Sequence, residues 1–208
     1  VYCKGGKHEE ALEYYTQALE IFQGIYIESH PFTAAVLKNI GDVYCKRGKH
    51  EEALEYYKRV LQMRQDIYTR RNHHELAAIL SSIGNVYCKQ GKHEQALKHL
   101  KKALKMYQQL LEICRANYRH RDVSSTYEYT PYYIAKGIAI TLNSIGKCYR
   151  AMGSDKEAVK YYEQILEIKG TRYLMEPDYF PKSTSALVNI GDIYSNLGEY
   201  SKTLTPYT

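Results

Sequence analysis

The sequence predicts an all-α fold, a solenoid of stacked helical hairpins, and three observations support this. A fifteen-residue block, Ile40–Leu54, is nearly copied at Ile83–Leu97, and looser copies begin at Ile145 and Ile190. Each copy carries a glycine near its centre, and apolar residues recur at helical spacing on both sides of that glycine. Self-similarity of this kind is typical of solenoids, because one unit cannot bury its apolar face without its neighbours.

Each unit is predicted to be two helices joined by a glycine turn. Gly48 can adopt the left-handed backbone conformation that ends a helix. Glu51 and Glu52 then fall in the first turn of the second helix, where the helix dipole favours acidic side chains. Gly41 and Ala53 are small, and we expect them where the two helices cross closely. The turn glycines are spaced 42, 43, 62 and 45 residues apart and comprise Gly6, Gly48, Gly91, Gly153 and Gly198.

The copies resemble the tetratricopeptide repeat in their order of apolar, small and aromatic residues. That pattern recurs over Leu80–Leu100 and Leu142–Tyr162, whereas a fifth copy has Thr203 where alanine is expected. The period exceeds the usual length of about 34 residues, and His30-Pro31 before an apolar stretch is similar to kinesin light chain repeats. The resemblance implies a right-handed superhelix with a peptide-binding concave groove. In the second unit, the residues that match the repeat pattern are Leu37, Ile40, Gly41, Tyr44, Ala53 and Tyr57.

The chain is expected to be a single array over residues 1–208, cut from a longer protein because both ends fall inside incomplete units. Gly91 and Gly153 are about 19 residues farther apart than Gly48 and Gly91, which predicts an extended hairpin between the third and fourth repeats. It is either a protruding arm that contacts a partner or an elongated hairpin that packs on itself. The expected units are a partial repeat over about 1–32, repeats over 33–74, 75–130 (with the extension) and 131–180, and a partial repeat over 181–208.

Several classes of function are disfavoured because the sequence lacks their characteristic motifs. No apolar run approaches the roughly 18 residues that a membrane span needs. No Gly-x-Ser-x-Gly elbow and no phosphate-binding glycine loop is present, so we predict no catalytic site and no cofactor in this chain. The array could still be the non-catalytic part of a larger enzyme.

The five cysteines are expected to be reduced thiols in a cytoplasmic protein. Cys3, Cys45 and Cys88 occupy equivalent places in successive repeats, roughly 10 Å apart, which is beyond the ~7 Å limit for a disulfide. Each is followed five residues later by a histidine, as in Cys45 and His50. We predict no metal site, because each turn supplies two ligands whereas structural zinc uses four.

The resemblance places the first helix of each hairpin on the concave face. Asparagine there can donate to and accept from the backbone of an extended peptide, and lysine favours acidic residues on that peptide. Asp42 replaces the asparagine that a terminal-carboxylate clamp requires, which disfavours that mode of binding. The alternative is a set of merely solvated helix positions. The predicted partner-binding row is Lys4, Lys38, Asn39, Lys46, Asn85, Lys89, Asn143, Lys147 and Arg150.

A second basic feature lies on the second helix of the third unit. Residues 89–121 carry a net charge of +7, against +6 for the whole chain. Such a stripe can bind nucleic acid or an acidic membrane surface. We predict a solvated outward face and no nucleic-acid partner, because aromatic residues are not interleaved. The stripe comprises Lys98, Lys101, Lys102 and Lys105.

The favoured function is therefore an adaptor that binds an acidic or extended partner segment in its groove. A self-associating spacer is the other alternative, because the open ends of a solenoid expose apolar faces.

Overall fold

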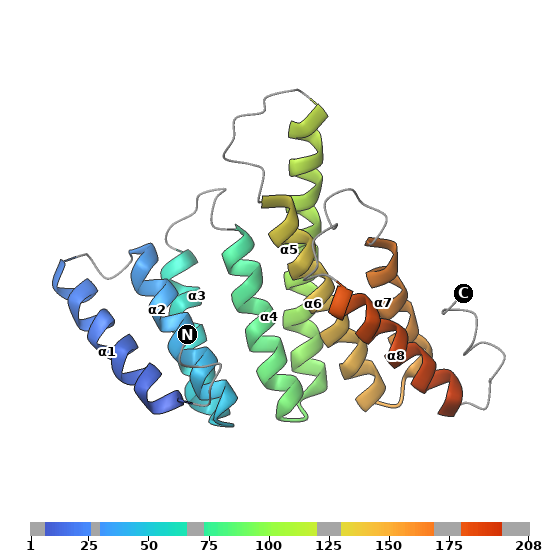
Figure 1. Ribbon diagram of the computed structural model, residues 1–208, viewed down its shortest axis with the longest axis horizontal. Coiled ribbons are helices and arrows are strands. Elements are labelled where there is room, and N and C mark those ends of the chain that lie inside the picture. The colour runs from blue at the N-terminus through green and yellow to red at the C-terminus, as the bar shows by residue number, and fades with distance from the viewer. Residues whose placement is uncertain (1–6, 26–29, 66–72, 120–129, 169–179, 197–208) are drawn as a thin grey trace.

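The computed structural model describes residues 7–25, 30–65, 73–119, 130–168 and 180–196. Within these ranges all regular secondary structure is helical, which confirms the predicted all-α class (Figure 1). Consecutive helices run antiparallel as hairpins, and the hairpins stack side by side. The helices are α1 (His8–Ile25), α2 (Pro31–Lys46), α3 (His50–Gln65), α4 (His73–Lys89), α5 (His93–Arg119), α6 (Thr130–Ala151), α7 (Asp155–Ile168) and α8 (Phe180–Asn196).

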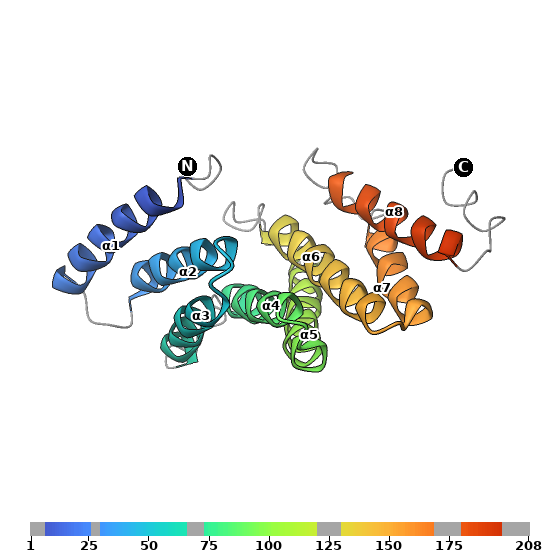
Figure 2. The ribbon, with the colours of Figure 1, turned by 90° about the horizontal axis from the view of Figure 1, so that it is seen from below.

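The stack is curved, as the view along the hairpins shows (Figure 2). The first helices α2, α4, α6 and α8 follow the inner side of the arc, and the second helices α3 and α5 lie on its outer side. Side chains from several first helices therefore face a common concave surface.

The hairpin turns are closed by glycine in the left-handed conformation, as predicted. Gly48, Gly91 and Gly153 have φ angles of 75°, 73° and 73°. The residue after each glycine returns a backbone hydrogen bond to the preceding helix, as Lys49 does to the Tyr44 carbonyl at 3.0 Å. This closure satisfies carbonyl groups that the helix end would otherwise leave unpaired. The predicted turns at Gly6 and Gly198 lie outside the described residues.

The two helices of each hairpin cross at glycine, and the crossing is too close for a side chain. A methyl group at Gly41 would lie 2.8 Å from Tyr57 Cε1. At Gly146 the corresponding distance to Tyr162 Cε1 is 2.5 Å. The expectation that small residues mark the crossing is thus confirmed.

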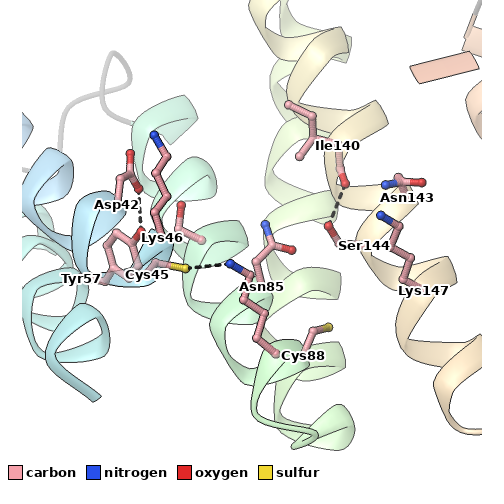
Figure 3. A pocket seen from close by; sticks show the side chains of 12 residues that line it. Asp42, Cys45, Lys46, Tyr57, Asn85, Cys88, Ile140, Asn143, Ser144 and Lys147 are labelled. Carbon is pink, nitrogen blue, oxygen red and sulfur yellow. Dashed lines mark hydrogen bonds between the residues drawn. The ribbon is translucent and has the colours of Figure 1, made fainter. Parts of the chain in front are cut away.

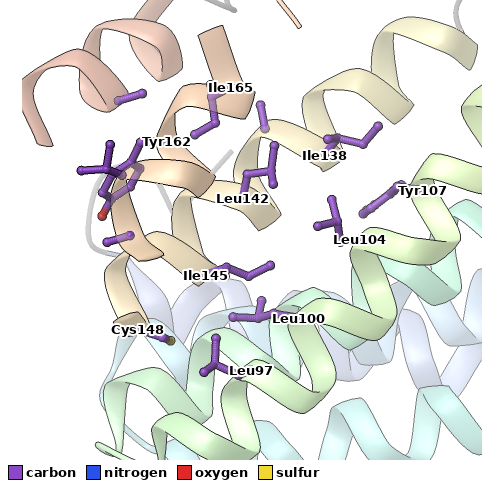
Figure 4. Close-up of a cluster of buried hydrophobic side chains, with 14 of the residues drawn as sticks. Leu97, Leu100, Leu104, Tyr107, Ile138, Leu142, Ile145, Cys148, Tyr162 and Ile165 are labelled. Carbon is purple, nitrogen blue, oxygen red and sulfur yellow. The ribbon is translucent and has the colours of Figure 1, made fainter. Parts of the chain in front are cut away.

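The core runs along the stack between first and second helices (Figure 4). Ile138, Leu142 and Ile145 of α6 pack between side chains of α5 and α7, including Leu104 and Ile165. Burying one such side chain contributes roughly 1.5–3 kcal/mol, so stacking supplies most of what holds the hairpins together.

The third and fourth hairpins contain the longest helices among the described residues. α5 has 27 residues and α6 has 22, against 16 each for α2 and α3. Where these two helices pack together, Tyr107 of α5 lies over Gly137 of α6 and is only 5% exposed. The segment expected to connect them, 120–129, lies outside the described residues. No described helix is both long and apolar enough to cross a membrane.

Candidate functional site

A cavity of about 550 Å³ lies between α2, α4 and α6 on the concave side of the stack (Figure 3). Three successive first helices supply nearly all of its wall, and Tyr57 of α3 completes it. The lining residues are Asp42, Cys45, Lys46, Tyr57, Ser82, Asn85, Cys88, Lys89, Ile140, Asn143, Ser144 and Lys147.

Five residues of the predicted binding row line this cavity, namely Lys46, Asn85, Lys89, Asn143 and Lys147. They come together because equivalent positions in stacked repeats fall one beside the next. Three other members of the row do not line it, and Lys4 lies outside the described residues.

Lys38 is one of those three, because Asp42 holds its ammonium group. Lys38 Nζ donates to Asp42 Oδ2 at 2.6 Å, and the Tyr57 hydroxyl donates to Asp42 Oδ1 at 2.6 Å. Burial, and then the neighbouring Asp42 carboxylate, raise the pKa of Tyr57 far above its ordinary value. The Asp42 charge is therefore balanced within its own hairpin.

Arg150 is directed toward α8 rather than into the cavity. Its Nη1 donates to Asn189 Oδ1 at 3.2 Å and lies 3.7 Å from Asp192 Oδ2. Asn189 in turn donates to Asn143 Oδ1 at 3.4 Å, so Arg150 and Asn143 belong to one network between two repeats. Asn39, the last of the three, is half-buried.

The cavity is electropositive and its charge varies along the stack. Asp42, Asn85 and Lys147 occupy the same position in successive repeats, directly after the crossing glycine. That column changes from negative through neutral to positive between α2 and α6. Lys46 and Lys89 form a second column at the helix ends, and both are exposed.

A cluster that the sequence interpretation missed borders the cavity. Cys88 and Cys148 form a disulfide with Cα atoms 6.2 Å apart, so the expectation that these thiols are reduced is wrong for this pair. That expectation compared equivalent positions only, whereas Cys148 stands two residues before the position equivalent to Cys88. The sequence did contain one indication of this pairing: Cys148 occupies a position that is valine in other units, namely Val43 and Val86. Cys45 and Cys114 are free thiols.

All four lysines of the basic stripe on α5 are exposed: Lys98, Lys101, Lys102 and Lys105. Lys101 in addition donates from Nζ to the Tyr149 hydroxyl at 2.7 Å and lies 5.3 Å from the centre of that ring. The hydrogen bond raises the pKa of Lys101, so this lysine ties α5 to α6.

Replacing Lys101 by alanine should therefore lower the free energy of unfolding by about 0.5–1 kcal/mol, the usual contribution of an exposed cation–aromatic contact. For a chain of this length that is a fall in melting temperature of roughly 1–4 °C. Lys105→Ala is the matched control, because it removes the same charge from an exposed position of the same helix. Calorimetry measures both variants, and equal melting temperatures would mean that the contact contributes nothing.

Comparison with known proteins relates the chain to a repeat family. Profiles described as tetratricopeptide repeat match residues 1–66, 65–109 and 139–172. A search of curated proteins gives no match.

Solved structures of the same architecture cover nearly the whole chain. A Podosopora anserina kinesin light chain candidate with nearly identical TPR-like repeats has a TM-score of 0.65 at 18% identity, covering 98% of this chain and 85% of the other. BtubC (BKLC) from P. vanneervenii has a TM-score of 0.73 at 18% identity, covering 98% and 72%. A Rap protein complexed with Competence and Sporulation Factor has a TM-score of 0.67 at 23% identity, covering 99% and 49%.

The family assignment depends on the sequence profiles and on the hairpins that they match. The profiles match more than half of the residues, and the matched hairpins contain the glycine turns and glycine–aromatic crossings described above. The chain belongs to the tetratricopeptide repeat family.

Proposed function

We propose that this chain is a protein-interaction scaffold that binds an extended, acidic segment of a partner protein in the cavity between α2, α4 and α6. The observation that carries the proposal is the composition of the wall. Three exposed lysines and two asparagines, drawn from three repeats, face one space of about 550 Å³.

The chemistry of the wall suits a peptide backbone with carboxylate side chains. Asn85 offers a donor and an acceptor of the kind that an extended backbone requires. Lys89 and Lys147 supply positive charge at the α4 and α6 end, where acidic side chains would lie. At the α2 end Lys38 is paired with Asp42, and Lys46 adds a further exposed positive charge. Because the Asp42 carboxylate would repel a terminal carboxylate, we expect the partner to be recognised through internal acidic residues.

Proteins of this fold provide a precedent for binding. The Rap protein noted above was solved in complex with Competence and Sporulation Factor. We further propose that this chain acts in the cytoplasm as a non-catalytic module and that the lysines of α5, on the outer side of the arc, are not its contact surface. Self-association through the end helices, and attachment to a catalytic domain, stay predictions.

Binding can be tested with a fluorescein-labelled peptide of alternating glutamate and serine, with a lysine–serine peptide as the charge control. We expect the fluorescence anisotropy to rise when the chain is added to the acidic peptide but not when it is added to the basic one. Added salt should weaken the binding of the acidic peptide, because exposed charges are screened over about 8 Å at physiological ionic strength. Lys89→Glu with Lys147→Glu should weaken binding at least tenfold, about 1.4 kcal/mol.

The matched control for that pair is Lys102→Glu with Lys105→Glu, which makes the same change in charge on the outer helix. It should leave the affinity within a factor of about two, since long-range effects of exposed charges are small. If the outer pair abolishes binding and the cavity pair does not, the partner uses the outer face and the proposal is wrong.

A further inference from the structure

We propose that Cys88, His93 and Cys148 form a binding site for a thiophilic metal ion of the zinc class, which becomes available when the Cys88–Cys148 disulfide is reduced. One ligand atom from each of the three residues lies within 4.8 Å of the other two. Two sulfurs and one imidazole nitrogen are donors that zinc prefers over the oxygen ligands of calcium or magnesium.

The fold brings the three residues together from three helices. Cys88 is the second-to-last residue of α4, and His93, on the other side of the Gly91 turn, is the first residue of α5. The His93 amide donates to the Gly91 carbonyl at 3.0 Å, which places the start of α5 beside the end of α4. Cys148 reaches them from α6, and its side chain is 1% exposed beside Leu97 and Leu100 (Figure 4).

The preceding hairpin provides an internal comparison. Cys45 and His50 repeat the pair Cys88 and His93, but Val86 stands where Cys148 would complete the set. His50 and His93 both have a buried Nδ1 atom that lacks a hydrogen-bond partner among the described residues. The unpartnered imidazole is therefore a property of the repeat, and the third ligand is what distinguishes the later hairpin.

The oxidised and reduced forms differ in their capacity to bind a metal. A dithiol reductant breaks the S–S bond, delivers two electrons and two protons, and leaves as its own disulfide. The two thiols can then lose their protons to a divalent ion, which takes two thiolates and the neutral imidazole as ligands. Two thiolates balance the charge of the dication. Three protein ligands leave a fourth position for water, as in open zinc sites.

The test titrates cobalt(II), as a spectroscopic probe for zinc, into the full chain reduced with a phosphine. We expect a thiolate-to-cobalt charge-transfer band and tetrahedral d–d bands that saturate at one equivalent and disappear when zinc is added. The oxidised chain should show neither band. His93→Gln should weaken cobalt binding at least tenfold, whereas His50→Gln, at the matched position, should leave it unchanged.

Cys148→Val is the decisive variant, because it installs the residue found at positions 43 and 86 and so is expected to preserve the fold. Its melting temperature checks that expectation, and the serine variant Cys148→Ser replaces it if the valine variant does not fold. Loss of the cobalt bands in the folded variant supports the site. Bands that persist in Cys148→Val, or that never appear in the reduced parent chain, would overturn it.

Discussion

Replacing Ala96 by tryptophan is expected to lower the free energy of unfolding by about 1–3 kcal/mol or more, because the helix crossing has no space for a ring. Ala96 is 0% exposed, and its carbonyl oxygen would lie 3.2 Å from a methyl group placed at Gly84. The same methyl group would lie 2.6 Å from Leu100 Cγ, so the neighbouring side chain already fills the remaining space. The α4–α5 hairpin would have to open to accept the larger residue. For this chain length we expect the melting temperature to fall by roughly 2–12 °C.

The matched control is Lys102→Trp, which adds the same ring to an exposed position of the same helix. Exposed substitutions usually change stability by no more than about 0.5 kcal/mol. Differential scanning calorimetry on both variants measures the difference. If Ala96→Trp melted at the temperature of Lys102→Trp, the crossing assigned to Gly84 and Ala96 would be wrong.

The second large effect is a loss of stability at alkaline pH that arises from buried tyrosines. Burial raises the pKa of Tyr107 to about 12 and that of Tyr162 to about 12, with Arg150 acting in the opposite direction on Tyr162. Unfolded tyrosine ionises near pH 10. Between pH 10 and 12 the unfolded chain therefore holds fewer protons than the folded one, and stability falls as the pH rises. The contribution is fully present below pH 10. Across that interval the contribution of each of these tyrosines to the free energy of unfolding should fall by about 2.7 kcal/mol.

Tyr162→Phe isolates one of these contributions. The Tyr162 hydroxyl is buried, and the nearby Arg150 already donates to Asn189, so removing the hydroxyl should cost little at neutral pH. Urea unfolding from pH 8 to 12 should show a shallower alkaline decline in this variant than in the parent. Tyr133→Phe, at a position 55% exposed, is the control and should leave the decline unchanged. An equal decline in Tyr162→Phe and the parent would show that burial does not hold this phenol neutral.

Much of the fold could be predicted because its determinants are local and repeated. Gly48 and Gly91 close turns that require a left-handed residue, and this requirement can be read from one unit and checked in the next. The close crossing at Gly41 was likewise predictable, because a small residue recurs there in every unit, whereas the contact with Tyr57 is known only from the structure. The extended hairpin was harder to assess, since its connection at 120–129 has no counterpart in other units and lies outside the described residues.

The cavity was predictable in outline, because one helical position repeated along a stack forms a row. Which members of that row face the cavity depended on their neighbours. Lys38 is held by Asp42 within its own helix, and Arg150 is directed to Asn189 of the next repeat. These preferences are decided by distances between side chains, which the repeat pattern does not contain.

The sequence by itself determined the all-α class, the glycine turns, the close helix crossings and the row of lysines and asparagines. Only the tertiary structure showed that Cys148 meets Cys88 and His93, and that Lys101 meets Tyr149. The physical reason is the range of the interactions involved. Turns and helix faces depend on residues a few positions apart, whereas these contacts join residues 48 and 60 positions apart in the chain. Such pairs meet only after α6 has packed against α4 and α5, so their geometry follows from the stacking of whole hairpins.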